Sequence, residues 1–164
     1  FLRPKALASD TSSSIDAIIH AIDYLYNLGR KYDYILLLEP TSPLREVKDL
    51  EEAFYLITHR NLESLVSVSE ATTHHPNFML SINHKHCMEP YLKDVNCNNL
   101  RRQDLRNCYF LDGSIYISSI ASLRKHRGFY HDNAYAYVLP KWKSLEIDDL
   151  DDFLMVEALM SHRL

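Results

Sequence analysis

Residues 34–45 read YILLLEPTSPLR, and this stretch constrains the fold more than any other part of the chain. An unbroken apolar run ends abruptly in an acid, two prolines and an arginine. The run predicts a strand over residues 34–38 that is buried on both faces, followed by a loop. Because ligands of open parallel α/β sheets bind beyond the carboxyl ends of the strands, we expect a functional site at the turn formed by residues 39–43.

The segments around this strand alternate between helical and extended patterns. Apolar residues recur at helical spacing over residues 15–25, where Ser13 and Asp16 have the spacing of a capping box and Gly29 closes the segment. A second helix is predicted over residues 47–57, shortly after Pro43, and a last one over residues 150–159. The alternation of strand, loop and helix indicates an α/β protein.

Further strands are predicted over residues 62–68, 78–82, 88–92 and 134–139. The two short ones at 78–82 and 88–92 flank a polar His-Lys-His turn, which suggests a hairpin arm. In residues 109–117 the pair Asp112 and Gly113 allows two readings, a turn between two segments or one strand with a bend or bulge at Gly113.

Composition limits the classes of protein that are possible. The chain has 164 residues, of which 46% are hydrophobic and 24% charged, which is ordinary for one soluble domain spanning residues 1–164. A net charge of −4 gives no electrostatic case for a nucleic-acid partner, and no segment suggests a membrane span. Three cysteines without metal spacing favour reduced thiols in a cytoplasmic protein.

Three polar patterns could carry chemistry. Glu146 and Asp148 lie two residues apart, so on an extended segment both carboxylates face the same way, as a Mg²⁺ site needs; acids at a helix start are the structural alternative. Hydroxyls of residues 12–14 at a helix start suit a phosphate or ribose, although such serines are usually caps. Arg101 and Arg102 could hold an anion or lie on a solvated surface.

Five motifs in order carry a family resemblance. They are RPKALASDTSSSIDAI at 3–18, LLLEPTSPLR at 36–45, RRQDL at 101–105, DGSIYI at 112–117 and EIDDLDDF at 146–153. Together they resemble the acylneuraminate cytidylyltransferases, the CMP-sialic acid synthetases and their relatives for legionaminic or pseudaminic acid. The resemblance implies a Rossmann-like nucleotidyltransferase fold, a three-layer α/β sandwich, with a protruding dimerisation arm at about residues 74–108.

The resemblance also implies a reaction and its partners. The anomeric hydroxyl of a nonulosonic α-keto sugar acid attacks the α-phosphate of CTP and releases pyrophosphate, without a covalent enzyme intermediate. Positioning two anions against each other requires charge neutralisation, for which the resemblance implies Mg²⁺. The expected partners are therefore CTP, the sugar acid and a second copy of the chain in a homodimer.

Roles for individual residues follow from the matched motifs. Asp148 and Glu146 are the expected metal ligands, and Asp148 and Arg102 are the expected catalytic residues, with Arg102 holding the substrate carboxylate. The residues expected to contact the nucleotide are Arg3, Ser12 and Ser14. The residues expected to contact the sugar substrate are Glu39, Thr41, Ser42, Arg102, Asp112 and Tyr116, and Arg45 is also expected to border the substrate pocket.

Two departures from the family pattern bear on function. Glu39 stands where the sialic-acid enzymes commonly carry Gln, which exchanges an amide for an acceptor-only carboxylate and could change the sugar preference. The family also begins with a strand and a glycine-rich loop that cradles the triphosphate, and no counterpart of that loop lies in the chain. We therefore expect an N-terminally truncated domain with little or no cytidylyltransferase activity in isolation.

Two other functions stay open at the level of sequence. One is a noncatalytic module for sugar-nucleotide binding or dimerisation that lost the loop during evolution. The other is a nucleotidyltransferase for a different acid sugar, such as a 3-deoxy-octulosonate, or for a different nucleotide. Dependence of activity on Arg102 would separate enzymes that capture a substrate carboxylate from those that do not.

Overall fold

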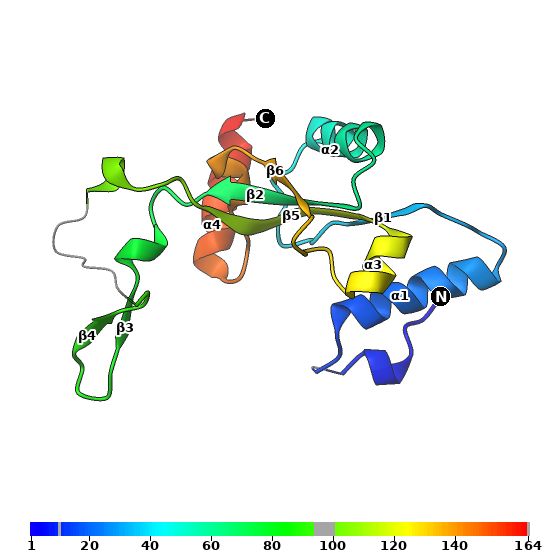
Figure 1. Cartoon of the computed structure of the whole chain (residues 1–164), viewed down its shortest axis with the longest axis horizontal. Helices are drawn as coiled ribbons and strands as arrows, with labels where there is room; N and C mark the ends of the chain where they lie inside the picture. Colours follow the sequence, from blue (N-terminus) through cyan, green and yellow to red (C-terminus); the bar gives the residue numbers. More distant parts are fainter. Residues whose placement is uncertain (10, 94–100, 164) are drawn as a thin grey trace.

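The computed structural model describes residues 1–9, 11–93 and 101–163. Helices and strands alternate along these residues, as the sequence predicts, and Figure 1 shows their arrangement. The strands are β1 (Tyr34–Leu37), β2 (Ser64–Glu70), β3 (Leu80–Ile82), β4 (Met88–Pro90), β5 (Tyr109–Ser119) and β6 (Tyr135–Val138). The helices are α1 (Ser14–Asn27), α2 (Val47–His59), α3 (Ile120–His126) and α4 (Leu150–Arg163), of which α3 was not expected from the sequence.

The main sheet is mixed, not parallel. Its four strands lie in the order β1-β5-β2-β6, with β5 antiparallel to both β1 and β2, and β6 parallel to β2. The prediction that residues 34–38 form a strand buried on both faces of a parallel sheet is therefore wrong. Among the described strands β1 has only β5 as a neighbour, and Leu36 remains 39% exposed.

Helices cover both faces of the sheet, which agrees with the expected three-layer arrangement. On one face, Ala53 and Ile57 of α2 pack on Leu65, Ile115 and Ile117 of the central strands. On the other face, α1 and α3 pack around Val66, as Figure 1 shows with α2 on one side of the strands and α1 on the other. Burial of these apolar faces is the main favourable term that holds the layers together.

The helix starts form as the sequence suggests, with one difference. The hydroxyl of Ser13 accepts a hydrogen bond from the backbone N–H of Ile15 at 3.2 Å and so caps α1. The predicted partner, Asp16, does not complete a capping box and forms an ion pair with Arg127 instead. This ion pair joins α1 to the residue that follows α3.

Residues 109–119 form one strand with a bulge, which decides between the two alternatives for this segment. Tyr116 lies opposite Val66 and Leu111 lies opposite Val68, so the register shifts between these two pairs. Gly113, within the bulge, has a φ of 70°, in the left-handed region that favours glycine. The bulge brings the backbone of β5 close to the segment before α4.

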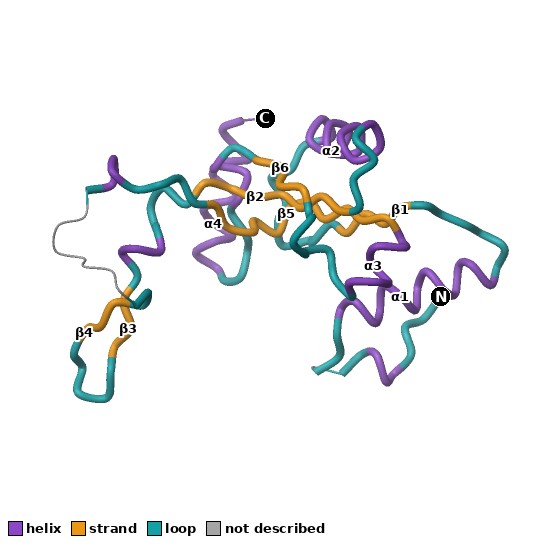
Figure 2. The backbone as a smooth tube through the Cα atoms, in the orientation of Figure 1, coloured by secondary structure: helices purple, strands orange, loops and turns teal. Residues whose placement is uncertain are grey.

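The predicted hairpin arm is present as β3 and β4, which pair only with each other among the described strands. Figure 2 shows this hairpin reaching away from the four-stranded sheet. Residues 94–100, which belong to the expected arm at 74–108, lie outside the described residues. No helix in the described part of the chain has both the length and the apolar character needed to cross a membrane.

Candidate functional site

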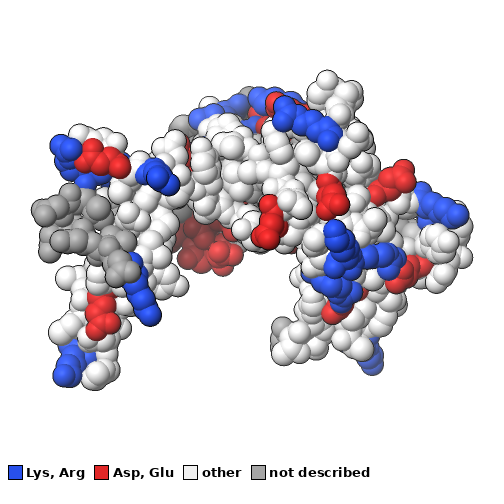
Figure 3. Space-filling view, in the orientation of Figure 1, with Lys and Arg blue, Asp and Glu red and all other residues white. Residues whose placement is uncertain are grey.

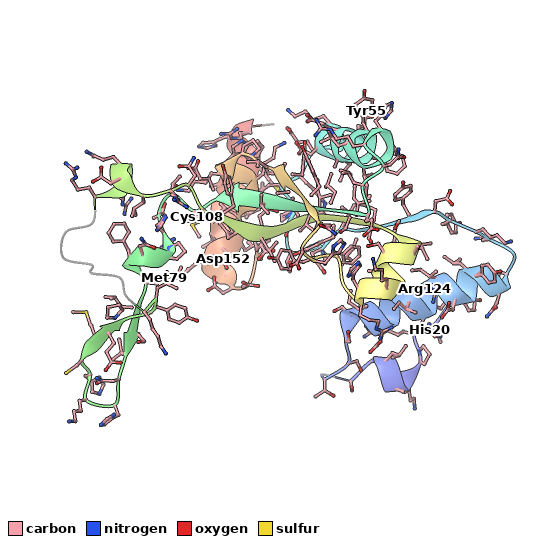
Figure 4. The ribbon with its side chains drawn as sticks, in the orientation of Figure 1. His20, Tyr55, Met79, Cys108, Arg124 and Asp152 are labelled. Atoms are coloured by element: carbon pink, nitrogen blue, oxygen red, sulfur yellow. The ribbon has the colours of Figure 1, made fainter. Side chains whose placement is uncertain are left out.

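Four carboxylates from three segments gather near the end of β1. We call Glu39, Asp112, Glu146 and Asp148 the acidic cluster; they come from the loop after β1, from the bulge of β5 and from the segment before α4. Glu146 interacts electrostatically with each of the other three. Figure 3 shows acidic side chains on the wall of a hollow beneath the sheet, and Figure 4 places Asp152, at the start of α4, in the same region.

Two hydrogen bonds join the loop after β1 to the segment that carries Glu146. The Ser42 hydroxyl donates to Glu146 Oε1 at 3.1 Å, and the backbone N–H of Ile147 donates to the Thr41 carbonyl at 2.8 Å. The loop itself is held by Arg45, whose guanidinium donates to the carbonyls of Glu39, at 2.8 Å, and Ser42. The predicted site residues of the two motifs are therefore in direct contact.

Gly113 makes room for the Glu146 carboxylate. A Cβ atom at this position would lie 1.5 Å from Glu146 Oε1 and 3.0 Å from the Ser42 hydroxyl. Both distances are shorter than van der Waals contact, so any side chain here displaces the carboxylate. The glycine is therefore required for the close approach of β5 as well as for its backbone conformation.

The position of Asp112 is set by two serines of β2. Its carboxylate is fully buried and accepts hydrogen bonds from the hydroxyls of Ser67 and of Ser69, the latter at 2.8 Å, and from the backbone N–H of Ser114 at 3.1 Å. Ser67 also accepts a bond from the Ile115 N–H at 2.8 Å and so closes the gap that the bulge opens in the ladder. Sequence reasoning missed these serines, because the predicted strand over residues 62–68 stops before Ser69, whereas β2 continues to Glu70 and places both hydroxyls on one face.

The electrostatics of the cluster favour a bound cation. Burial raises the pKa of Glu146, and the charges of Asp148, Asp112 and Glu39 raise it further, while the hydrogen bond from Ser42 opposes the shift. Burial and the nearby carboxylates of Glu146, Asp112 and Glu39 also raise the pKa of Tyr116. A site in which negative charges repel one another is stabilised by a cation that neutralises them.

Asp148 is the exposed member of the pair proposed to bind metal. Its backbone N–H donates to Asp152 Oδ2 at 3.1 Å, and the Asp152 N–H donates to Asp149 Oδ1 at 3.0 Å. Asp149 and Asp152 therefore act as acids that cap the start of α4, which was the alternative to metal binding for this acidic run. The Asp148 carboxylate takes no part in these caps.

Arg102 lies away from the acidic cluster, beside the base of the hairpin. Its guanidinium donates to the Thr72 carbonyl at 3.4 Å and lies 5.8 Å from the ring centroid of Phe78. It lines a cavity of about 400 Å³, and a neighbouring cavity of about 490 Å³ shares three residues with the first. Figure 4 shows Met79 and Cys108, each lining one of these cavities, on the hairpin side of the sheet.

The predicted nucleotide residues lie at the start of α1. Ser12 accepts a bond from the Ser9 N–H and donates to the Ala6 carbonyl, both at 3.1 Å, so its hydroxyl holds the loop before the helix. Arg3 and Ser14 are exposed. Figure 1 shows α1 on the side of the sheet opposite α2. No described contact joins these residues to the acidic cluster or to Arg102.

Lys143 supports the site and gave no signal in the sequence. Its side chain is only 2% exposed, and its ammonium lies 2.7 Å from Glu46 Oε2 and 2.5 Å from Asp49 Oδ2, at the start of α2. The Ser114 hydroxyl donates to the Lys143 carbonyl at 3.4 Å. Lys143 thus ties α2 and β5 to the chain just before Glu146.

Comparison with known proteins shows homology over nearly all of the chain, although no protein-family model matches it. It is 29% identical to an N-acylneuraminate cytidylyltransferase of Streptococcus agalactiae over 94% of this chain and 36% of the relative. It is 29% identical to a CMP-N,N'-diacetyllegionaminic acid synthase of Legionella pneumophila, over 98% of this chain and 68% of the relative. It is 25% identical to a pseudaminic acid cytidylyltransferase of Campylobacter jejuni, over 97% of this chain and 67% of the relative.

The chain spans about a third of the length of the streptococcal relative and about two thirds of the other two. The matched parts cover 94% to 98% of the chain. This chain is therefore a homologue of the cytidylyltransferases named for acylneuraminic, legionaminic and pseudaminic acids.

Proposed function

We propose that the protein transfers CMP from CTP to a nonulosonic, sialic-acid-like sugar acid. In this reaction the anomeric oxygen of the sugar forms a bond to the α-phosphorus, the bond from that phosphorus to the β-phosphate oxygen breaks, and pyrophosphate leaves. The proton of the anomeric hydroxyl is released to water. The observation that carries the proposal is the acidic cluster at the end of β1, built from the motifs that resemble the cytidylyltransferases.

The residues present fit a magnesium ion. Mg²⁺ prefers hard oxygen ligands and usually takes one or two carboxylates, completing its shell with water and substrate phosphates. Glu146 and Asp148 supply such a pair, and burial together with the neighbouring carboxylates raises the pKa of Glu146. When bound, Mg²⁺ would neutralise charge that develops on the phosphates. Ser42 orients Glu146, and Tyr116 borders the same cluster.

Arg102 and the two adjoining cavities are proposed to hold the sugar acid. Cavities of 300 to 1,000 Å³ are typical of small-molecule sites, and a guanidinium pairs well with the carboxylate that distinguishes these sugars. Lys141 lines the second cavity, where its ammonium contacts the hydroxyls of Thr72 and Thr73 at 2.9 and 2.6 Å. In this arrangement the sugar lies on the hairpin side, and the nucleotide near α1.

The hairpin is proposed to contribute to a homodimer. Its strands present Leu80, Ile82 and Met88 to solvent, with exposed fractions of 45%, 70% and 72%. An isolated two-stranded hairpin is marginally stable in water, and such apolar exposure is typical of surfaces that bind another chain. A second copy of this chain would cover these side chains.

The decisive experiment measures pyrophosphate release by the product of the complete open reading frame that encodes this chain. CTP and Mg²⁺ are supplied with a panel of nonulosonic acids and, separately, with a 3-deoxy-octulosonate. We expect release with at least one nonulosonic acid. Release only with the octulosonate would assign a different acid sugar, and no release with any acid would contradict the proposal.

The carboxylate contact is tested by Arg102→Ala. A hydrogen bond to a charged group is worth about 1.5–3 kcal/mol, so KM for the sugar acid should rise about 10- to 150-fold while KM for CTP stays unchanged. Arg102→Lys should recover only part of the affinity, because an ammonium cannot bind a carboxylate with two parallel bonds. The matched control is Arg101→Ala, since Arg101 is exposed and pairs with Asp104 at 2.6 Å. Equal effects of both alanine variants would contradict the role of Arg102.

The metal site is tested by the thermal stability of Glu146→Gln. The pKa of Glu146 is higher in the folded state than its ordinary value of 4.5, so ionisation of this carboxyl lowers the free energy of unfolding. The loss of stability begins as the pH rises past 4.5 and is complete once the pH exceeds the raised pKa. Without metal, the variant should melt above the wild type at pH 7 and match it below about pH 4. A Mg²⁺ concentration of 100 Kd should stabilise the wild type by about 2.7 kcal/mol and the variant much less. An identical gain in both would exclude Glu146 as a ligand.

A further inference from the structure

A second cluster of ligating side chains lies away from the acidic cluster. Glu63 directly precedes β2, His126 ends α3, and His131 lies in the loop that leads to β6. One possible ligand atom from each lies within 4.8 Å of the other two, the only such group of three or more in the described residues. In Figure 4, Arg124 marks α3 at the opposite end of the sheet from Asp152. The reaction proposed above uses none of these three residues.

The backbone fixes the positions of all three residues. The Ser119 N–H donates to the Glu63 carbonyl at 2.9 Å, which holds Glu63 beside the start of α3. Arg127 ends α3 in a left-handed conformation, with a φ of 54°, and turns the chain back. The Ser64 hydroxyl then donates to the Phe129 carbonyl. As a result the ring of His131 stacks on that of His126, with centroids 4.0 Å apart.

The unused atom of this cluster is Nε2 of His126. It is buried and makes no hydrogen bond within the described structure. Its distance to Glu63 Oε2 is 3.7 Å, beyond the usual hydrogen-bond range of about 2.7–3.2 Å. Bonds of 2.0–2.1 Å to a tetrahedral zinc place two ligand atoms about 3.3 Å apart. The observed separation therefore suits two ligands of one ion better than a direct contact.

We propose that Glu63, His126 and His131 form a zinc site. Two imidazoles and one carboxylate are donors that Zn²⁺ binds readily, whereas Mg²⁺ and Ca²⁺ prefer oxygen alone. The half-exposed Glu63 side chain leaves a fourth position open to water. The ion would link the start of β2 to α3 and to the loop between α3 and β6. This role is separate from the proposed nucleotidyltransferase reaction.

Binding requires one of the two stacked rings to turn. The lone pairs of stacked imidazoles lie in parallel planes, so one ring must tilt before both can bind the same ion. His131 must also give up one of its two contacts, to the Ser122 hydroxyl at 3.2 Å or from the Asn133 N–H at 3.3 Å. Both contacts are long, so either costs little to break.

Calorimetric titration of the chelator-treated, complete protein with ZnCl2 tests the site. We expect one equivalent of Zn²⁺ per chain, a higher melting temperature with zinc, and no displacement by excess MgCl2. Glu63→Gln, His126→Gln and His131→Gln should each weaken zinc binding about tenfold or more, since loss of an outer-shell partner alone costs 10- to 100-fold. Titration with CoCl2 should give a visible absorption band that the same variants lose.

The matched control is His84→Gln, because His84 is an exposed histidine in the turn between β3 and β4, on the hairpin that reaches away from the sheet, and it is distant in sequence from all three residues of the cluster. It should bind zinc like the wild type. Glu63→Gln keeps the test valid if a histidine variant does not fold, since its side chain is 50% exposed. Absence of one-equivalent binding in the wild type, or binding that Glu63→Gln and the folded histidine variants leave unchanged, would overturn the zinc site.

Discussion

Replacing Lys143 with methionine is expected to lower the free energy of unfolding by about 3–5 kcal/mol, the usual cost of removing one partner of a buried ion pair. Methionine fills a similar volume but leaves the Asp49 carboxylate, whose side chain is 6% exposed, without its cation. A typical domain is stable by about 5–15 kcal/mol in total, so this single change removes much of it. Urea denaturation followed by circular dichroism measures the loss.

Two further variants separate the charge effect from lost packing. In the wild type, the backbone N–H of Glu46 donates to Asp49 Oδ2 at 2.7 Å. In the double variant Lys143→Met/Asp49→Asn, the amide oxygen of the new asparagine can still accept this hydrogen bond but carries no charge. The double variant should therefore be more stable than Lys143→Met alone. Lys48→Met removes an exposed lysine that pairs with the same Glu46, and its stability should stay close to that of the wild type. A double variant no more stable than the single one would assign the loss to packing.

The position of Lys143 links this stability to the candidate site. Glu46 and Asp49 begin α2, directly after the loop that contains Glu39 and Ser42, while Lys143 lies three residues before Glu146. The buried ion pair therefore holds together the two segments that the Ser42–Glu146 hydrogen bond joins. Metal ligands must be held by rigid surroundings to bind well, and Lys143 would give that support to the proposed ligand Glu146.

The sequence predicts the local elements because short-range patterns determine them. The apolar spacing of α1 and α2 is visible within a single window, as are the proline before α2 and the hairpin of β3 and β4. The pairing of strands is not local. The apolar run at 34–38 looks like a central parallel strand, yet β1 pairs with β5, some 80 residues later, in antiparallel register at the sheet edge. An apolar run alone does not specify its partner or direction.

The same distinction applies to the site. Motifs located Glu39, Ser42, Asp112 and Glu146 individually, and the structure brings them together through contacts between residues far apart in sequence, such as Ser42 and Glu146. Lys143 could not be predicted, because a lysine between a tryptophan and a serine looks like any surface residue until α2 covers it. Likewise the Glu63 and histidine cluster depends on the turn at Arg127, which no local pattern indicates.

Gly113→Ala is expected to reduce the rate of pyrophosphate release about 100-fold, the typical effect of misplacing a reacting group by about 1 Å. The new methyl group would lie 1.5 Å from Glu146 Oε1, so the carboxylate must rotate away from Ser42 and the acidic cluster. The displaced group is the flexible end of a side chain, so the fold can accommodate the change. The stabilisation by Mg²⁺ should weaken together with the activity.

Gly29→Ala is the matched control, because it reproduces the backbone strain without the clash. Gly29 has a φ of 78°, close to the 70° of Gly113, but nothing lies within 4 Å of the Cβ position there. Each alanine should cost about 1–2 kcal/mol of stability from the left-handed conformation. Only Gly113→Ala should lose activity and the magnesium effect. Equal kinetics for the two variants would mean that the Glu146 carboxylate does not need its present position, and the acidic cluster could then not be the metal site.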